Sequence, residues 1–150
     1  MPAAFLTEDM RQQAIGCESQ GPTLEVEKGA ILKFAQAIGD ANPRWNDEAA
    51  ARKSRYGGLI APPTFLRLMG HVRPPLPFDL PFQRLLDGGS DWEYFEPIRS
   101  GDRISSSARV ENIVERPGRL GVMIITTTKV TYHNQLGELV ATQISTSIRY

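Results

Sequence analysis

The sequence contains few of the residues that form disulfides and metal sites. Cys17 is the only cysteine, and His71 and His133 are the only histidines, among 150 residues. One cysteine excludes a disulfide within the chain and a thiolate zinc cluster. Two histidines would need carboxylates to complete a metal site. We therefore expect no bound metal ion.

The sequence also lacks the features of membrane and secreted proteins. No run approaches the roughly 18 apolar residues that a membrane-spanning helix needs. Residues 1–11 carry Glu8 and Asp9 and have neither the basic nor the apolar part of a secretory signal. Together with the single cysteine, these absences predict a cytoplasmic protein that makes no membrane contact.

There is no excess of charge of either sign, because 17 Lys and Arg balance 17 Asp and Glu. A neutral chain does not attract a phosphate backbone, so no nucleic-acid partner is expected. The motifs GxGxxG, GxxxxGK[ST], HExxH and GxSxG are absent, which argues against nucleotide-binding, zinc-peptidase and α/β-hydrolase sites. The composition is that of a globular protein, and the length predicts one domain, residues 1–150.

The first half of the chain has helical periodicity. Apolar residues recur every three or four positions from Lys28 to Ile38, and Gly39 follows where a helix cap is expected. Asp47 is placed to cap a second short helix over residues 48–52. Both segments are therefore predicted to be helices.

A third helix is predicted at the centre of the fold. Pro62 and Pro63 suit its first turn, where a missing N–H is tolerated. The residues that follow are apolar on most sides, so this helix needs burial. It is expected to end near Gly70, and further prolines keep residues 71–86 irregular.

After Asp87-Gly88-Gly89 the hydrophobic period becomes two, which predicts β-strands. The alternating segments are residues 104–114, 122–132 and 140–148. In the last of them the alternating residues run from Val140 to Ile148 at even numbers. Turns are expected at Pro117-Gly118 and at residues 134–137. The second half is therefore predicted to be an antiparallel meander packed on an apolar helix, which is an α+β fold.

Three stretches resemble, in the same order, the MaoC-like hydratase/dehydratase family. They are Phe34–Phe65 (FAQAIGDANPRWNDEAAARKSRYGGLIAPPTF), Tyr94–Asp102 (YFEPIRSGD) and Asn134–Val140 (NQLGELV). The corresponding family patterns include GD-x-NP-x-H, G-x-x-I-A-H-G and F-x-x-P-V-x-x-G-D. The resemblance covers about residues 24–150. It implies a single hot dog fold, in which an antiparallel β-sheet wraps around a central apolar helix.

The resemblance also implies a reaction. Active family members add water reversibly across the double bond of an enoyl thioester. The aspartate and histidine of GD-x-NP-x-H hold and deprotonate this water, and a backbone N–H at the start of the central helix stabilises the enolate oxygen. Such a site needs no cofactor beyond the thioester of coenzyme A or acyl carrier protein that is its substrate.

This chain keeps only part of that site. Asp40 matches the family aspartate, but Trp45 stands at the histidine position and has no basic nitrogen. Pro63 stands at the glycine whose N–H would stabilise the enolate, and proline has no N–H to donate. The chain alone is therefore not expected to be a competent hydratase.

The same pattern resembles one branch of the family, the N-terminal MaoC-like dehydratase domain. In that branch the domain holds the acyl chain, and a second hot dog carries the aspartate and histidine. We expect a dimer, because one hot dog leaves a sheet edge unpaired. The partner is a second copy or a catalytic MaoC-like chain. Ending the central helix near Gly70 would leave space inside the sheet for the acyl group.

Further residues of these motifs are candidate substrate-binding residues. They are Asn42, Trp45, Tyr56, Gly57, Gly58, Ile60, Ala61 and Thr64. Several have a structural alternative: Asp40 as a turn residue, Trp45 as core packing and Thr64 as a helix cap. Gly57 and Gly58 fit either close approach to the thioester or a plain turn.

Two function classes remain open at the level of the sequence. The first is an acyl-binding subunit of an enoyl-thioester hydratase or 3-hydroxyacyl dehydratase. The second is a stand-alone homodimer that binds or hydrolyses acyl thioesters, with Asp40, Asp47 or Glu48 as its only base. The basic run Arg52–Arg55 is expected to be a solvated helix face, with contact to coenzyme A phosphates as the alternative.

Overall fold

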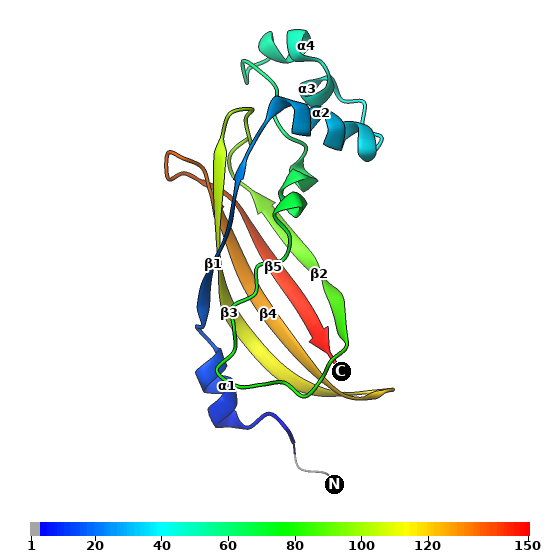
Figure 1. The fold of residues 1–150 in the computed structure, drawn as a ribbon, viewed down its shortest axis with the longest axis vertical. Helices are drawn as coiled ribbons and strands as arrows, with labels where there is room; N and C mark the ends of the chain where they lie inside the picture. Colours follow the sequence, from blue (N-terminus) through cyan, green and yellow to red (C-terminus); the bar gives the residue numbers. More distant parts are fainter. Residues whose placement is uncertain (1–3) are drawn as a thin grey trace.

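The computed structural model describes residues 4–150, and its main feature is a five-stranded antiparallel sheet (Figure 1). The strands are β1 (Glu18–Glu25), β2 (Leu85–Tyr94), β3 (Arg103–Gly118), β4 (Gly121–His133) and β5 (Leu139–Arg149). The helices are α1 (Glu8–Ala14), α2 (Lys28–Ala37), α3 (Pro43–Asn46), α4 (Glu48–Arg52) and the 3-10 helix η1 (Pro63–Met69). The strand order β1-β3-β4-β5-β2 contains the expected meander, flanked by β1 and β2. The α+β class is confirmed.

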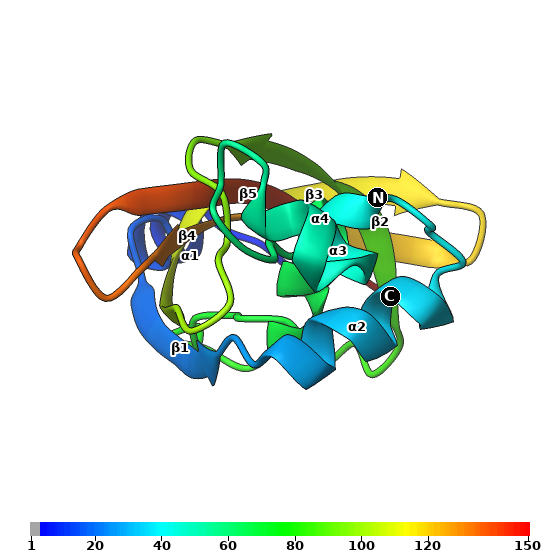
Figure 2. The same cartoon turned by 90° about the horizontal axis from the view of Figure 1, so that it is seen from above.

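The sheet curves around η1, as Figure 2 shows from above, while α2, α3 and α4 gather at one end of the sheet. Phe65 and Leu66 of η1 are fully buried in the main core. This is the expected hot dog arrangement, but the central helix is a seven-residue 3-10 helix. Pro63 lacks an N–H at its start, and Gly70, with a φ of 72°, ends it. Within residues 4–150 no helix is long and apolar enough to cross a membrane.

Residues 70–84 form the predicted irregular segment, which runs along the face of the sheet to the end opposite α2 (Figure 1). Four of its side chains pack against a second, smaller core that contains Ile113 and Ile124. These side chains are Leu76, Phe78, Leu80 and Phe82. The segment therefore packs apolar side chains against the sheet in the region where empty apolar space was expected.

Two strands, β1 and β2, and two helices, α1 and the four-residue α3, were not expected from the sequence. β1 is an edge strand of mostly polar residues, and Gly21 and Pro22 interrupt its alternation at a register shift. β2 begins at Leu85 and includes Gly88 and Gly89, which lie at a bulge opposite β5. Glycine inside a strand marks such bulges, whereas the sequence pattern suggests a turn. α1 precedes the region covered by the family resemblance.

Pro117 and Gly118 are also within a strand, contrary to the expected turn. Pro117 pairs with Val122 and Gly118 pairs with Gly121 in the β3–β4 ladder, so the chain reverses at residues 119 and 120. β1 begins opposite Arg109, and the last part of β3 therefore has β4 on one side only. Proline is tolerated there because its missing N–H is on an unpaired edge.

The core-facing residues of β5 differ from the alternating set seen in the sequence. Ala141 and Gln143 pair with the buried Tyr132 and Val130 and are themselves almost fully buried. Ile144 and the other even-numbered residues that follow therefore lie on the opposite face of the sheet. A polar residue is accommodated in the core because Gln143 accepts a hydrogen bond from the Tyr132 hydroxyl at 3.1 Å.

Stability at high pH is expected to depend on Tyr132. Burial raises the pKa of Tyr132 to about 12, while a tyrosine in the unfolded chain titrates near 10. Above about pH 10 the unfolded state loses a proton that the folded state keeps, so the free energy of unfolding falls as the pH rises. In Tyr132→Phe, urea denaturation should show a flatter dependence between about pH 10 and 12. An unchanged slope would contradict this assignment.

Candidate functional site

The loop after α2 is shaped by Asp40 and Asn42. The Asp40 carboxylate accepts a hydrogen bond from the Asn42 backbone N–H at 3.0 Å. The Asn42 side chain accepts one from the Arg44 N–H at 3.0 Å and caps α3. Both side chains therefore accept hydrogen bonds within the turn. A turn role of this kind was the alternative to catalysis that the sequence left open for Asp40. These hydrogen bonds fix the start of α3, the helix that carries Trp45.

Trp45 of α3 is 8% exposed and packs in the main core. It also lines a pocket on the surface of that core, so its ring packs in the core and borders a pocket at the same time. Its indole N–H is buried and has no hydrogen-bond acceptor within residues 4–150. An unpaired buried donor typically costs about 1–3 kcal/mol, so this N–H lowers the stability of the folded chain.

The pocket lined by Trp45 has a volume of about 360 Å³. Its other lining residues are Arg44, Arg55, Tyr56, Ile60, Ala61, Pro63, Tyr94, Phe95, Glu96, Pro97 and Ile98. Two distant segments are joined beside it, since Ile60 and Arg99 form an isolated β-bridge and the Ala61 N–H donates to the Ile98 carbonyl at 2.7 Å. The pocket therefore depends on contact between the segment that follows β2 and the segment before η1.

The pocket brings together four of the candidate binding residues, namely Trp45, Tyr56, Ile60 and Ala61, together with Pro63. The other candidates, Asp40, Asn42, Gly57, Gly58 and Thr64, are not among its lining residues. Gly57 has a φ of 71° and open space where a side chain would start, which fits a turn. Thr64 is exposed, and η1 has no side-chain cap.

One side of the pocket, formed by residues 94–98 at and after the end of β2, was not among the binding residues predicted from the sequence. Tyr94 and Phe95 are 40% and 48% exposed, although both are large and apolar. Partial burial raises the pKa of Tyr94. The YFEPI stretch was identified only as a family motif, and its two exposed aromatic residues are the signal that could have placed it at a site.

Three arginines surround Tyr56, which lines the pocket. The guanidinium carbons of Arg55, Arg44 and Arg99 lie 4.8, 5.6 and 5.9 Å from the centre of the Tyr56 ring. Arg55 also donates to the Tyr56 hydroxyl at 2.6 Å, and Arg99 donates to the Tyr56 carbonyl. The hydrogen bond from Arg55, aided by the three positive charges, lowers the pKa of Tyr56.

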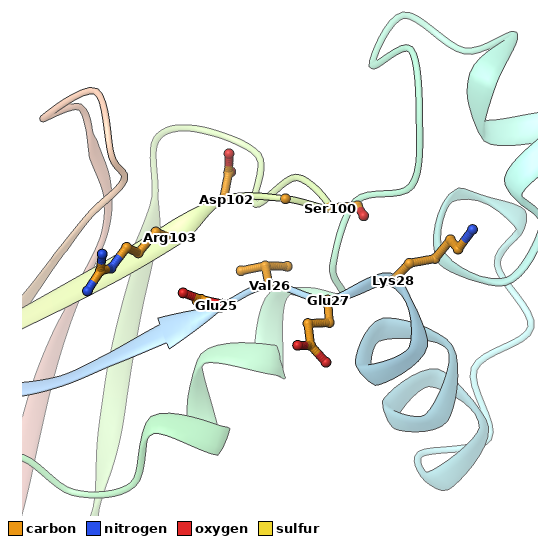
Figure 3. Close-up of a pocket in the computed structure, with 8 residues that line it drawn as sticks. Glu25, Val26, Glu27, Lys28, Ser100, Asp102 and Arg103 are labelled. Carbon is orange, nitrogen blue, oxygen red and sulfur yellow. The ribbon is translucent and has the colours of Figure 1, made fainter.

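Two other depressions are lined by none of the candidate binding residues. One, of about 500 Å³, lies between the β1–α2 junction and residues 100–103 (Figure 3). Both oxygens of the Asp102 carboxylate beside it accept a hydrogen bond, one from the Arg99 N–H at 2.8 Å and the other from the Gln135 side chain at 3.0 Å. The other, of about 450 Å³, lies under residues 73–80 and is lined partly by Thr126, Thr128 and Ser147. Its polar wall differs from the apolar space that was expected.

The pocket lined by Trp45 offers few groups for proton transfer. Glu96 is the only carboxylate among its lining residues, and no histidine lines it. Pro63 has no N–H, and the Ala61 N–H is already donated to Ile98. Residues 4–150 contain no group of three or more His, Cys, Asp or Glu residues placed to hold a metal ion.

An antiparallel sheet curved around a short central helix, with a GD-x-NP loop beside the start of that helix, defines the class of hot dog dehydratases. A family model described as "FAS1-like, dehydratase domain region" matches residues 13–143. The chain belongs to this family, and its fold is that of the MaoC-like hot dog proteins.

Individual relatives agree with this assignment. A UPF0336 protein from Streptomyces griseus is 33% identical over 129 residues, which are 83% of each chain. A probable enoyl-CoA hydratase alpha subunit from Thermomonospora curvata is 31% identical over 75% of this chain but only 41% of its own length. The crystal structure of a MaoC-like dehydratase from Rhodospirillum rubrum has a TM-score of 0.72 and 27% identity, covering 93% of this chain and 94% of that one.

Proposed function

We propose that the chain is the acyl-binding subunit of an R-specific enoyl-thioester hydratase or 3-hydroxyacyl dehydratase. The observation that carries this proposal is the composition of the pocket. Trp45 and Pro63 line it at the positions where the family pattern has its histidine and its glycine. The acyl thioester enters this pocket, and the catalytic aspartate and histidine come from a second hot dog chain. The hydratase alpha subunit among the relatives supports a divided enzyme of this kind.

The free edge of β2 supports the position of that second chain. β2 pairs with β5 on one side only. Leu85 and Leu86 at its start are 40% and 50% exposed, and Tyr94 and Phe95 at its end line the pocket. Unpaired, apolar sheet edges favour strand pairing with another chain. A partner bound along β2 would lie next to the pocket and could present its catalytic groups there.

The alternative of a stand-alone thioesterase has less support, because each of the three carboxylates that could serve as its base is engaged in another interaction. Asp40 is bound within its own turn, and Asp47 caps α4 through the Ala50 N–H at 3.1 Å. Glu48 pairs with Lys28 and Arg52 at 3.1 and 3.0 Å, and the hydrogen bond from Lys28 is the main cause that lowers its pKa. A base with a lowered pKa removes protons less effectively.

Hydration of a short and a long trans-2-enoyl-CoA by the purified chain tests the proposal. Loss of an oxyanion donor reduces rates about 100- to 1,000-fold, and loss of an acid/base group about as much again. We therefore expect turnover at least about 10⁴-fold below that of a complete family enzyme, and activity only when a chain with the D-x4-H pattern is added. Size-exclusion chromatography with light scattering, on the same samples, would show whether the two chains associate.

Asp40→Asn is the matched variant for that assay. If Asp40 only shapes its turn, the variant and the parent chain should be equally inactive alone. Clear turnover by the chain alone that is lost in Asp40→Asn would overturn the proposal, because Asp40 would then be the base of a complete site.

A further inference from the structure

The arginines around Tyr56 come from three separate segments of the chain. Arg44 belongs to α3, Arg55 follows α4, and Arg99 lies between β2 and β3. All three are exposed, Arg44 and Arg55 line the pocket, and the guanidinium groups of all three lie within 6 Å of the centre of the Tyr56 ring. Convergence of three like charges is unfavourable unless a negative group is close by.

No carboxylate of the chain supplies that negative charge. Within residues 4–150, Arg44, Arg55 and Arg99 form no ion pair, whereas Arg11, Arg52 and Arg67 each have an acidic partner. Glu96 lines the same pocket but is not within ion-pair distance of any arginine.

The hydrogen bonds to Tyr56 hold this arrangement in place. Arg55 uses one donor on the Tyr56 hydroxyl, and Arg99 uses one on the Tyr56 carbonyl. A guanidinium group has five N–H donors in a planar fork, so most remain for a ligand. That fork matches the oxygen atoms of a phosphate group, which it binds in a bidentate manner.

We propose that Arg44, Arg55 and Arg99 bind a phosphate group of the molecule whose acyl thioester occupies the pocket. This inference rests on the proposed acyl-binding function and adds the class of carrier to it. The carrier ends in a phosphorylated pantetheine arm, which is the chemistry that coenzyme A and the prosthetic group of a carrier protein share. The phosphate stays at the arginines while the thioester end points toward Trp45.

Binding of four related probes to the full chain tests this inference by isothermal titration calorimetry. The probes are an acyl-pantetheine without phosphate, the same acyl group on 4′-phosphopantetheine, the acyl-CoA, and coenzyme A without an acyl group. We expect phosphopantetheine and coenzyme A thioesters to bind at least about tenfold more tightly than acyl-pantetheine, because bonds to a charged group are strong. This advantage should shrink as salt is added.

The same probes separate the two sources of the phosphate. Equal affinity for acyl-phosphopantetheine and acyl-CoA would mean that the arginines bind the phosphate that both carriers share. Tighter binding of acyl-CoA would mean that the additional phosphates of coenzyme A are bound as well. Both results support the inference.

Single substitutions assign the effect to the arginines. Arg44→Gln, Arg55→Gln and Arg99→Gln should each weaken acyl-CoA binding about tenfold and leave acyl-pantetheine binding unchanged. Arg52→Gln is the matched control, since Arg52 is equally exposed on α4 but pairs with Glu48. It should leave both affinities unchanged.

Failure of this inference is distinguishable from failure of the proposed function. If acyl-pantetheine and acyl-CoA bind equally well, or the three variants bind acyl-CoA as the parent does, the phosphate site is wrong and acyl binding stands. If coenzyme A binds with the same affinity with and without an acyl group, the phosphate site stands and acyl binding is wrong. If no probe binds, both are wrong.

Discussion

Phe65→Ala is expected to lower the free energy of unfolding by about 3–5 kcal/mol. Phe65 is fully buried at the centre of the sheet's concave face, and its ring contacts Phe34 of α2 edge-on at a centroid distance of 5.5 Å. Truncation therefore leaves a cavity between the central helix and α2. Since small domains have a total stability of about 5–15 kcal/mol, the variant should lose a large part of it. Urea denaturation followed by circular dichroism measures this difference.

Leu68→Ala is the control in the same helix. Leu68 is 53% exposed, three residues from Phe65. Its truncation should change the free energy of unfolding by no more than about 0.5 kcal/mol. Equal destabilisation by the two variants would mean that η1 is not the buried centre of the fold.

Gly21→Ala is expected to destabilise the fold by about 1–3 kcal/mol, because it overpacks the contact between β1 and the core. A Cβ at this position would lie 2.2 Å from the Ser106 Oγ and 2.7 Å from a Val72 methyl group. Ser106 cannot move without loss of its hydrogen bond to the Pro22 carbonyl at 2.9 Å. The thermal midpoint of the variant should fall accordingly.

Gly29→Ala is the matched glycine, and its effect should have the opposite sign. Gly29 lies within α2, and a Cβ there would have no atom within 4 Å. Alanine is favoured over glycine in a helix by up to about 1 kcal/mol, so the thermal midpoint should rise. If both alanine variants behaved alike, close packing of β1 at Gly21 would not be the cause.

Local chemistry made some elements predictable from the sequence. Asp47 caps α4 as expected, through the Ala50 N–H. The turn at residues 134–137 forms because the Asn134 side chain accepts from the backbone of Leu136 and Glu138. Each of these features depends on residues a few positions apart, which a sequence pattern records directly.

Other elements depend on contacts between distant residues. β1 is polar and interrupted, and it is a strand only because β3 lies beside it. Gly88 lies in β2, directly beside β5. A Cβ at this position would lie 2.9 Å from a Thr146 methyl carbon, so the neighbouring strand leaves space only for the hydrogen of a glycine. No periodicity in β1 or β2 contains this information.

The candidate site divides in the same way. Trp45, Tyr56, Ile60 and Ala61 could be found because they belong to one contiguous family motif. Arg99 and the β2 side of the pocket could not, because they reach it through a bridge to Ile60 that spans about 40 residues of sequence. Asp40 matches the motif and also accepts a hydrogen bond within its turn, so its position in the motif alone does not establish a chemical role.

The buried indole N–H of Trp45 carries a cost to the stability of the fold. Within residues 4–150 this donor has lost its contact with water and gained no partner, so the folded state is less stable than its packing alone would make it. The large ring of the same residue fills space in the main core. The residue that replaces the family histidine therefore stabilises the fold through its ring and destabilises it through its N–H.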